Sequence, residues 1–77
     1  MSDDLTDRQR TMIAEIVRRC PDSTTTVTAA YLAALLRRDP AHVRADLAVL
    51  QRRRLLEPGS ALGTYRPTGT ARARYGT

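Results

Sequence analysis

The chain lacks several residue types, and each absence narrows the kind of protein it can be. It has no Phe, no Trp and no Lys, and its 77 residues include one Cys and one His. The core must therefore be built mainly from aliphatic side chains. A single cysteine, Cys20, cannot form an internal disulfide, and we expect it to be a buried small hydrophobe. Cys20 and His42 lie 22 residues apart and do not supply the ligand set of a metal site.

Long apolar runs and catalytic signatures are also missing. No apolar stretch approaches the roughly 18 residues that a membrane-spanning helix needs, and the amino terminus does not have the pattern of a signal peptide. We find no Ser-His-Asp grouping in a workable order and no glycine-rich phosphate loop. We therefore expect a cytoplasmic protein that is not an enzyme, needs no cofactor or metal, and contacts neither a membrane nor a small-molecule ligand.

Positive charge is concentrated in one half of the chain. All 13 basic residues are arginine, and the formal net charge is +5. Residues 1–23 hold four arginines against five acidic residues, residues 24–36 hold no charge, and residues 37–77 hold nine arginines against three acidic residues. A GC-rich genome would account for the use of arginine alone, but it would not account for this asymmetry. An uneven distribution of this kind is typical of a surface that faces nucleic-acid phosphates.

The first helix is predicted to begin at Thr6. Thr6 and Gln9 have the spacing of a capping box, in which each side chain bonds the other residue's backbone amide. Apolar residues then recur at helical spacing until Pro21 ends the helix. The residues of this buried face are Met12, Ile13, Ile16, Val17 and Cys20. A polar connector over residues 21–26 follows and leads into a short strand near Val27.

Two further helices are predicted over residues 28–37 and 40–54, joined by a tight turn. Thr28 caps the first of these helices, and Asp39 followed by Pro40 is a favourable start for the second. The buried stripe predicted for the first consists of Leu32, Leu35 and Leu36. The core-facing row predicted for the second consists of Val43, Leu47, Leu50 and position 54.

A β-hairpin is predicted after the third helix. Strand candidates over residues 55–57 and 64–66 flank the turn residues 58–63. The predicted fold class is therefore mainly α with a small β wing (α+β), a three-helix bundle that carries an antiparallel hairpin. Residues 1–77 are expected to form one domain. Residues 1–5 and 70–77 are expected to be flexible, with a short helix or a disordered tail after Thr68.

Residues 31–56 carry a pattern of residue types that is familiar from one class of protein. Leu32, Ala33 and Leu36 match x-Leu-Ala-x-x-Leu. The motif Val-Arg-x-Asp-Leu and the exit after it are matched by Val43, Arg44, Asp46, Leu47, Leu50, Leu55 and Leu56. This segment resembles the winged helix-turn-helix domains of bacterial transcription regulators, with the DeoR-like and MarR-like families nearest. The resemblance extends from Thr6 to about Arg74. It implies that the second helix of the helix-turn-helix, over residues 40–54, is the recognition helix that enters the DNA major groove.

The sequence departs from the family's pattern at two turns. Arg37 and Arg38 occupy the turn between the two helices, where the family has a glycine, and Arg54 stands where a second glycine usually follows the recognition helix. If these positions keep a left-handed backbone, a residue other than glycine costs roughly 1 kcal/mol. Otherwise the two turns take a different shape.

The outward face of the helix over residues 40–54 is the candidate DNA-reading surface. Arginine can bond guanine O6 and N7 together, and alanine can touch the thymine methyl group. The candidate base contacts are Ala41, His42, Arg44, Ala45 and Ala48. The candidate phosphate contacts are Thr28, Arg37, Arg38, Arg52, Arg53, Arg54 and Arg66, with Arg72 and Arg74 as further cations in the tail. Asp46 is expected to pair with an arginine from another helix.

Three functional hypotheses stay open at this point. The first is sequence-specific binding of double-stranded DNA by a small transcription regulator, such as a repressor, or by a phage or mobile-element protein, with a homodimer as one arrangement. The second is a protein-interaction winged helix that uses the face of Ala41, Ala45 and Ala48 as an adaptor surface. The third is a DNA-binding fragment whose dimerisation element is missing.

Overall fold

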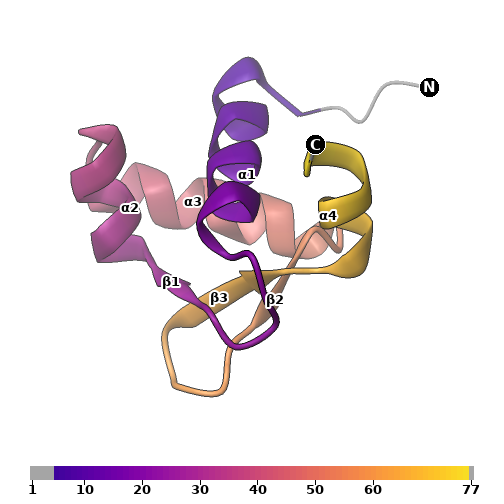
Figure 1. The fold of residues 1–77 in the computed structure, drawn as a ribbon. Coiled ribbons are helices and arrows are strands. Elements are labelled where there is room, and N and C mark those ends of the chain that lie inside the picture. Colours follow the sequence, from indigo (N-terminus) through magenta and orange to yellow (C-terminus); the bar gives the residue numbers. More distant parts are fainter. Residues whose placement is uncertain (1–4, 77) are drawn as a thin grey trace.

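The computed structural model describes residues 5–76, and these form four helices and a three-stranded sheet (Figure 1). The predicted fold class is confirmed. Residues 1–4 and 77, part of the ends expected to be flexible, lie outside the described residues. The elements are α1 (Asp7–Arg19), β1 (Val27–Thr28), α2 (Ala29–Leu36), α3 (Pro40–Arg52), β2 (Leu56–Pro58), β3 (Thr64–Pro67) and α4 (Gly69–Tyr75).

Helix α1 begins with the capping box that the sequence predicts. The backbone amide of Gln9 donates to Thr6 Oγ1 at 3.1 Å, and the amide of Thr6 donates to Gln9 Oε1 at the same distance. The helix ends at Arg19, two residues before Pro21. The predicted apolar face is confirmed as core, because Met12, Ile13, Ile16 and Cys20 are 0% exposed and Val17 is buried.

The connector between α1 and β1 is held by one carboxylate. Asp22 Oδ1 accepts from the hydroxyls of Thr24 and Thr25, at 2.8 and 2.9 Å, and from both of their backbone amides at 3.0 Å. These hydroxyl and amide bonds favour the charged form and lower the pKa of Asp22 to about 2. The local network gives a polar connector a defined shape before β1 starts.

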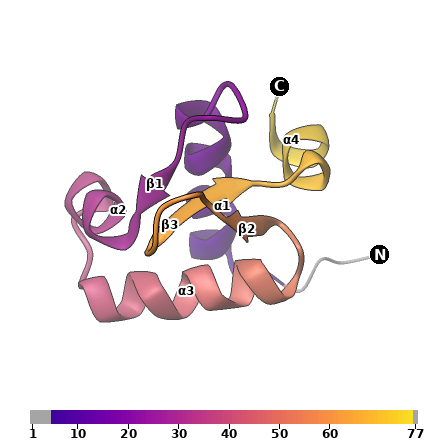
Figure 2. The ribbon, with the colours of Figure 1, turned by 90° about the horizontal axis from the view of Figure 1, so that it is seen from below.

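The sheet joins the predicted hairpin to the connector. Strand β3 lies in the middle and pairs antiparallel with β2 on one side and with β1 on the other (Figure 2). The predicted hairpin is confirmed, although β2 begins one residue later than expected, at Leu56, and β3 extends to Pro67. Both Leu55 and Leu56 are buried and belong to the hydrophobic core.

The core of α2 and α3 agrees with the sequence in part. Val43, Leu47 and Leu50 are 0% exposed, as their spacing on α3 predicts. Position 54 was wrongly included in that row, because α3 ends at Arg52 and Arg54 is exposed beyond it. On α2, Leu32 is fully buried as predicted. Leu35 and Leu36 are only half-buried, and Ala33 is the second buried residue, because an eight-residue helix turns a narrow face to α3.

The two arginines that replace the family's turn glycines keep the left-handed backbone. Arg37 ends α2 with φ 56°, and Arg54 follows α3 with φ 61°. The turns are closed by backbone bonds, among them Arg38 N to Ala33 O and Arg54 N to Gln51 O, both at 3.0 Å. Each arginine therefore occupies a conformation that glycine adopts without strain.

Substitution of Arg37 by glycine should raise the free energy of unfolding by about 0.5 to 1 kcal/mol. The left-handed strain is removed, and the gain is reduced because glycine makes the unfolded chain more flexible. Arg52→Gly is the matched control, because Arg52 has helical geometry in α3, where glycine costs up to about 1 kcal/mol. Urea denaturation of both variants measures the difference. Equal losses of stability would contradict the assignment of strain to Arg37.

Residues 69–75 form helix α4, the short helix that was one of the two alternatives expected after Thr68. Thr68 Oγ1 caps this helix by accepting from the amide of Ala71 at 3.2 Å, and Ala71 is 0% exposed. Tyr75 packs against the core, and α4 lies beside α1. At the opposite end of the described residues, Leu5 is also buried in the core. The segment has too few large apolar residues to predict this packing, because its single buried anchor is an alanine.

Candidate nucleic-acid interface

The solvent-facing side of α3 brings the five predicted base-contact residues together. Ala41, His42, Arg44, Ala45 and Ala48 are all exposed. The opposite side of the helix is buried in the core, and α3 forms one edge of the domain (Figure 2). Ala41, Ala45 and Ala48 follow at spacings of four and three, which places them in one row, with Arg44 and His42 on its two flanks. The result is a shallow, small-residue helix face beside one arginine.

The start of α3 is fixed by its capping residues. Asp39 Oδ1 accepts from the amide of Ala41 at 2.8 Å, and Pro40 occupies the first helical position. Thr28 has the same role at the start of α2, where Oγ1 accepts from the amide of Tyr31 at 3.1 Å. Thr28 is exposed, so its own hydroxyl hydrogen can be donated to a phosphate.

Exposed arginines lie close to both ends of α3. Arg37 is in the turn before the helix, and the arginines at the other end are Arg52, Arg53 and Arg54. Arg52 belongs to the last turn of α3, where its charge complements the helix dipole, and the other two continue past the helix end. These four arginines, like Thr28, are predicted phosphate contacts that are classed as exposed.

Arg38 faces the interior of the protein instead. Its Nη2 lies 2.7 Å from Asp46 Oδ2, and its side chain is 17% exposed against 6% for Asp46. Gln9 Nε2 donates to Asp46 Oδ1 at 3.1 Å, and Arg8 Nε lies 3.3 Å from Oδ2. The expected pairing of Asp46 with an arginine from another helix is confirmed by Arg8 of α1. The phosphate role predicted for Arg38 has to compete with this internal ion pair.

The charge of Asp46 is stabilised against its burial. Removal from water alone would raise the pKa of its carboxyl group. The hydrogen bonds from Arg38 and Gln9, together with the positive charges of Arg38 and Arg8, outweigh this effect and lower the pKa below its ordinary value. Asp46 therefore stays ionised and joins α3 to the start of α1 and to the turn after α2.

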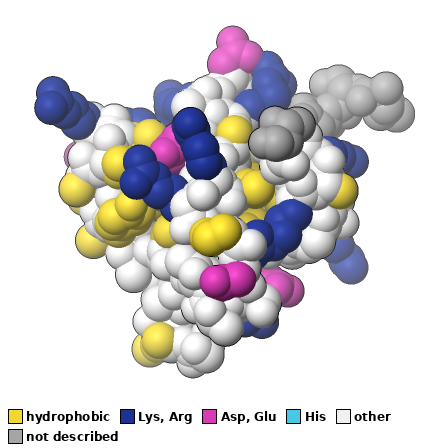
Figure 3. Space-filling view, viewed as in Figure 1, with side chains coloured by type: hydrophobic (Ala, Val, Ile, Leu, Met, Phe, Trp, Pro, Cys, Tyr) yellow, Lys and Arg dark blue, Asp and Glu magenta, His cyan; other side chains and the backbone are white. Residues whose placement is uncertain are grey.

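The wing contributes less charge than the sequence suggested. Arg66 pairs with Glu57, its cross-strand neighbour, at 2.9 Å, and its Nη1 donates to Ser23 O at 3.3 Å. The phosphate role predicted for Arg66 therefore has to compete with these bonds. Residues 58–65 carry no charge, and Leu62 is fully exposed. Figure 3 shows this uncharged end of the wing at the bottom of the view, and hydrophobic side chains gathered over α2.

Comparison with known protein families decides what kind of domain this is. Residues 4–76 match the family described as winged helix-turn-helix transcription repressor, HrcA DNA-binding. The chain belongs to this family. No curated protein and no solved structure gives a significant match. The resemblance to winged helix-turn-helix domains of bacterial regulators is confirmed, and the family matched is that of HrcA, whereas the sequence pattern was nearest to the DeoR-like and MarR-like families.

One further arginine of this HrcA-type domain lies near α3, although its sequence position gave no sign of this. Arg8 lies between the capping residues Thr6 and Gln9, and its contact with Asp46 brings it beside α3. No local pattern reveals this position, because it depends on how α1 crosses α3. Arg72, a candidate cation in the tail, is instead bonded within the protein. Its guanidinium bonds Cys20 O and lies 2.9 Å from Asp22 O, and so ties α4 to the connector.

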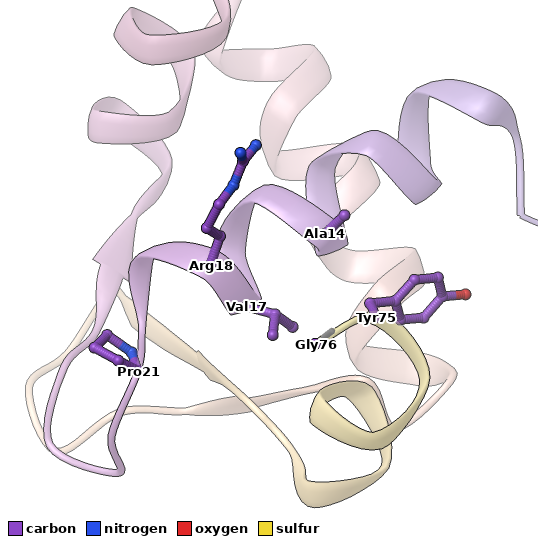
Figure 4. Close-up of a pocket in the computed structure, with 6 residues that line it drawn as sticks. All are labelled: Ala14, Val17, Arg18, Pro21, Tyr75 and Gly76. Carbon is purple, nitrogen blue, oxygen red and sulfur yellow. The ribbon is translucent and has the colours of Figure 1, made fainter.

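A surface depression of about 470 Å³ lies between α1 and the end of α4 in this HrcA-type domain (Figure 4). Its charged member, Arg18, pairs with Glu15 at 2.6 Å on α1. The lining residues are Ala14, Val17, Arg18, Pro21, Tyr75 and Gly76, and none belongs to α3 or the wing.

Within residues 5–76, each helix is too short or too polar to span a lipid bilayer.

Proposed function

We propose that this HrcA-type domain binds double-stranded DNA sequence-specifically, as a transcription repressor, with α3 in the major groove. The observation that carries the proposal is the exposed face of α3, where a row of alanines lies beside Arg44 and exposed arginines occur near both helix ends. Small side chains let the helix approach the base edges closely, and arginines at both ends can hold the two phosphate backbones.

Base contacts and phosphate contacts are assigned to different residues. Arg44 projects from the first half of α3 and can bond both acceptors of a guanine. Ala41, Ala45 and Ala48 can contact thymine methyl groups, and His42 lies where it can bond a base or a phosphate. Arg37 and the cluster of Arg52, Arg53 and Arg54 neutralise phosphates and contribute affinity for any sequence.

The salt dependence of binding should report the number of these ionic contacts. Four arginines near the ends of α3 imply a slope of about −4 for log affinity against log salt, from roughly −0.9 per phosphate neutralised. Fluorescence anisotropy with a labelled duplex from 50 to 300 mM salt measures this slope. Inclusion of Arg38 and Arg66 as full phosphate contacts would make it steeper by nearly two.

Selection from a random duplex pool, followed by the salt titration, tests the whole proposal. We expect enrichment of a defined sequence and tighter binding of that sequence than of the starting pool. Absence of duplex binding at 50 mM salt would contradict the proposal. That outcome would favour the alternative in which the row of Ala41, Ala45 and Ala48 binds the helix of another protein.

A further inference from the structure

Arg8 belongs to α1 but lies on the flank of α3. Its Nε is 3.3 Å from Asp46 Oδ2, in the middle of α3, and 62% of its side chain is exposed. The contact uses the Nε atom, and the degree of exposure shows that much of the side chain faces solvent. A cation from the start of the chain is thus placed beside the candidate DNA-reading helix.

Asp46 does not depend on Arg8 for its neutralisation. Arg38 Nη2 lies 2.7 Å from one carboxylate oxygen, and Gln9 donates to the other at 3.1 Å. The Arg38 pair is the shorter and the more buried of the two ion pairs, since the side chain of Arg38 is 17% exposed. The carboxylate therefore orients Arg8 while Arg38 carries the internal charge balance. In the longer, exposed pair, a phosphate oxygen can replace the carboxylate as the partner of Arg8 or can bind Arg8 in addition to it.

The position of Arg8 within α1 is not explained by helix stability. It lies in the first turn, two residues after the cap Thr6, where a positive charge opposes the helix dipole. A phosphate group at this position would be attracted both by the guanidinium and by the amino end of the helix. The arrangement suits an anion that approaches along the flank of α3.

We infer that Arg8 is a phosphate-binding residue of the DNA interface, held beside α3 by Asp46, whereas Arg38 forms the buried ion pair with Asp46. The inference rests on the proposed function and extends it. It adds a contact from α1 on a flank of α3, and it gives the buried carboxylate of Asp46 a role in positioning this contact as well as in packing.

The test is the salt dependence of DNA binding by the full chain carrying Arg8→Ala. Loss of one phosphate contact should make the slope shallower by about 0.9 and weaken binding about fivefold to tenfold in 0.1 M salt. Arg8→Lys should keep most of the slope, because it keeps the charge. Arg18→Ala is the matched control, since Arg18 is an exposed arginine of the same helix that pairs with Glu15, and it should leave the slope unchanged.

The possible outcomes separate this inference from the proposed function. If the unmodified chain binds duplex DNA and Arg8→Ala has the same slope, the role of Arg8 is overturned while the proposed function stands. A weaker affinity with an unchanged slope would also overturn it, because it would indicate a structural effect. If the unmodified chain does not bind duplex DNA at all, both proposals fail. A shallower slope in Arg8→Ala alone, with Arg18→Ala unchanged, supports the inference.

Discussion

Asp46→Ala should lower the free energy of unfolding by about 3 kcal/mol, the largest stability effect that we expect from an ionisable residue of this domain. The substitution leaves the guanidinium of Arg38 buried without its counter-charge and removes the acceptor of Gln9. Urea denaturation at neutral pH measures the loss. Glu57→Ala is the control, because its pair with Arg66 is partly exposed and such pairs contribute about 0 to 1 kcal/mol.

The same carboxylate predicts a pH dependence with a defined sign. The pKa of Asp46 is lower in the folded protein than its ordinary value of 3.8. Its contribution to stability is therefore complete above that ordinary value, and it is lost as the pH falls through the lower, folded value. The stability difference between the unmodified chain and Asp46→Asn should shrink on acidification below about pH 4. A difference that stays constant down to pH 2 would contradict the ion-pair account.

Arg44→Ala should reduce discrimination among DNA sequences by about 1 to 3 kcal/mol, roughly a fivefold to 150-fold loss of preference. The side chain is exposed, so the domain should keep its stability while it loses the hydrogen bonds to one base. The measurement is the ratio of affinities for the selected duplex and for a duplex altered at one guanine at a time. The ratio should fall at one position and be retained at the others.

Arg52→Ala is the matched control for Arg44. Both are exposed arginines of α3, but Arg52 lies in its last turn, where it is placed to contact phosphate. This variant should bind all duplexes more weakly by a similar factor and should make the salt slope shallower by about 0.9. If the two variants lose affinity and preference in the same way, the division between base and phosphate contacts is wrong.

The helix starts were the most predictable feature of the sequence. Thr6, Thr28 and Asp39 all cap helices as expected, because a cap is a local interaction between residues two or three positions apart. Helix α4 was harder to recognise. A short helix after Thr68 was one of two alternatives, and its packing depends on the small residue Ala71 and on contacts with α1 that no local pattern encodes.

The candidate site was predictable only where exposure follows from helical periodicity. The outward residues of α3 were found from spacing alone, because the core row fixes which side faces solvent. Which arginines outside α3 are paired was not predictable, since charge runs do not show which guanidinium meets a carboxylate. Arg38 and Arg66 turned out to be paired with Asp46 and Glu57, and Arg8 was overlooked. These pairings depend on how elements distant in the sequence cross.

An NMR titration of the labelled domain with a duplex oligonucleotide at low salt tests the central claim most directly. The amides of α3, residues 41–52, should shift most, together with those near Arg37 and Arg8. The amides around the depression between α1 and α4, such as those of Ala14 and Tyr75, should stay in place. If the α3 amides stay unshifted while the duplex is present in excess, α3 does not bind DNA and the account is contradicted.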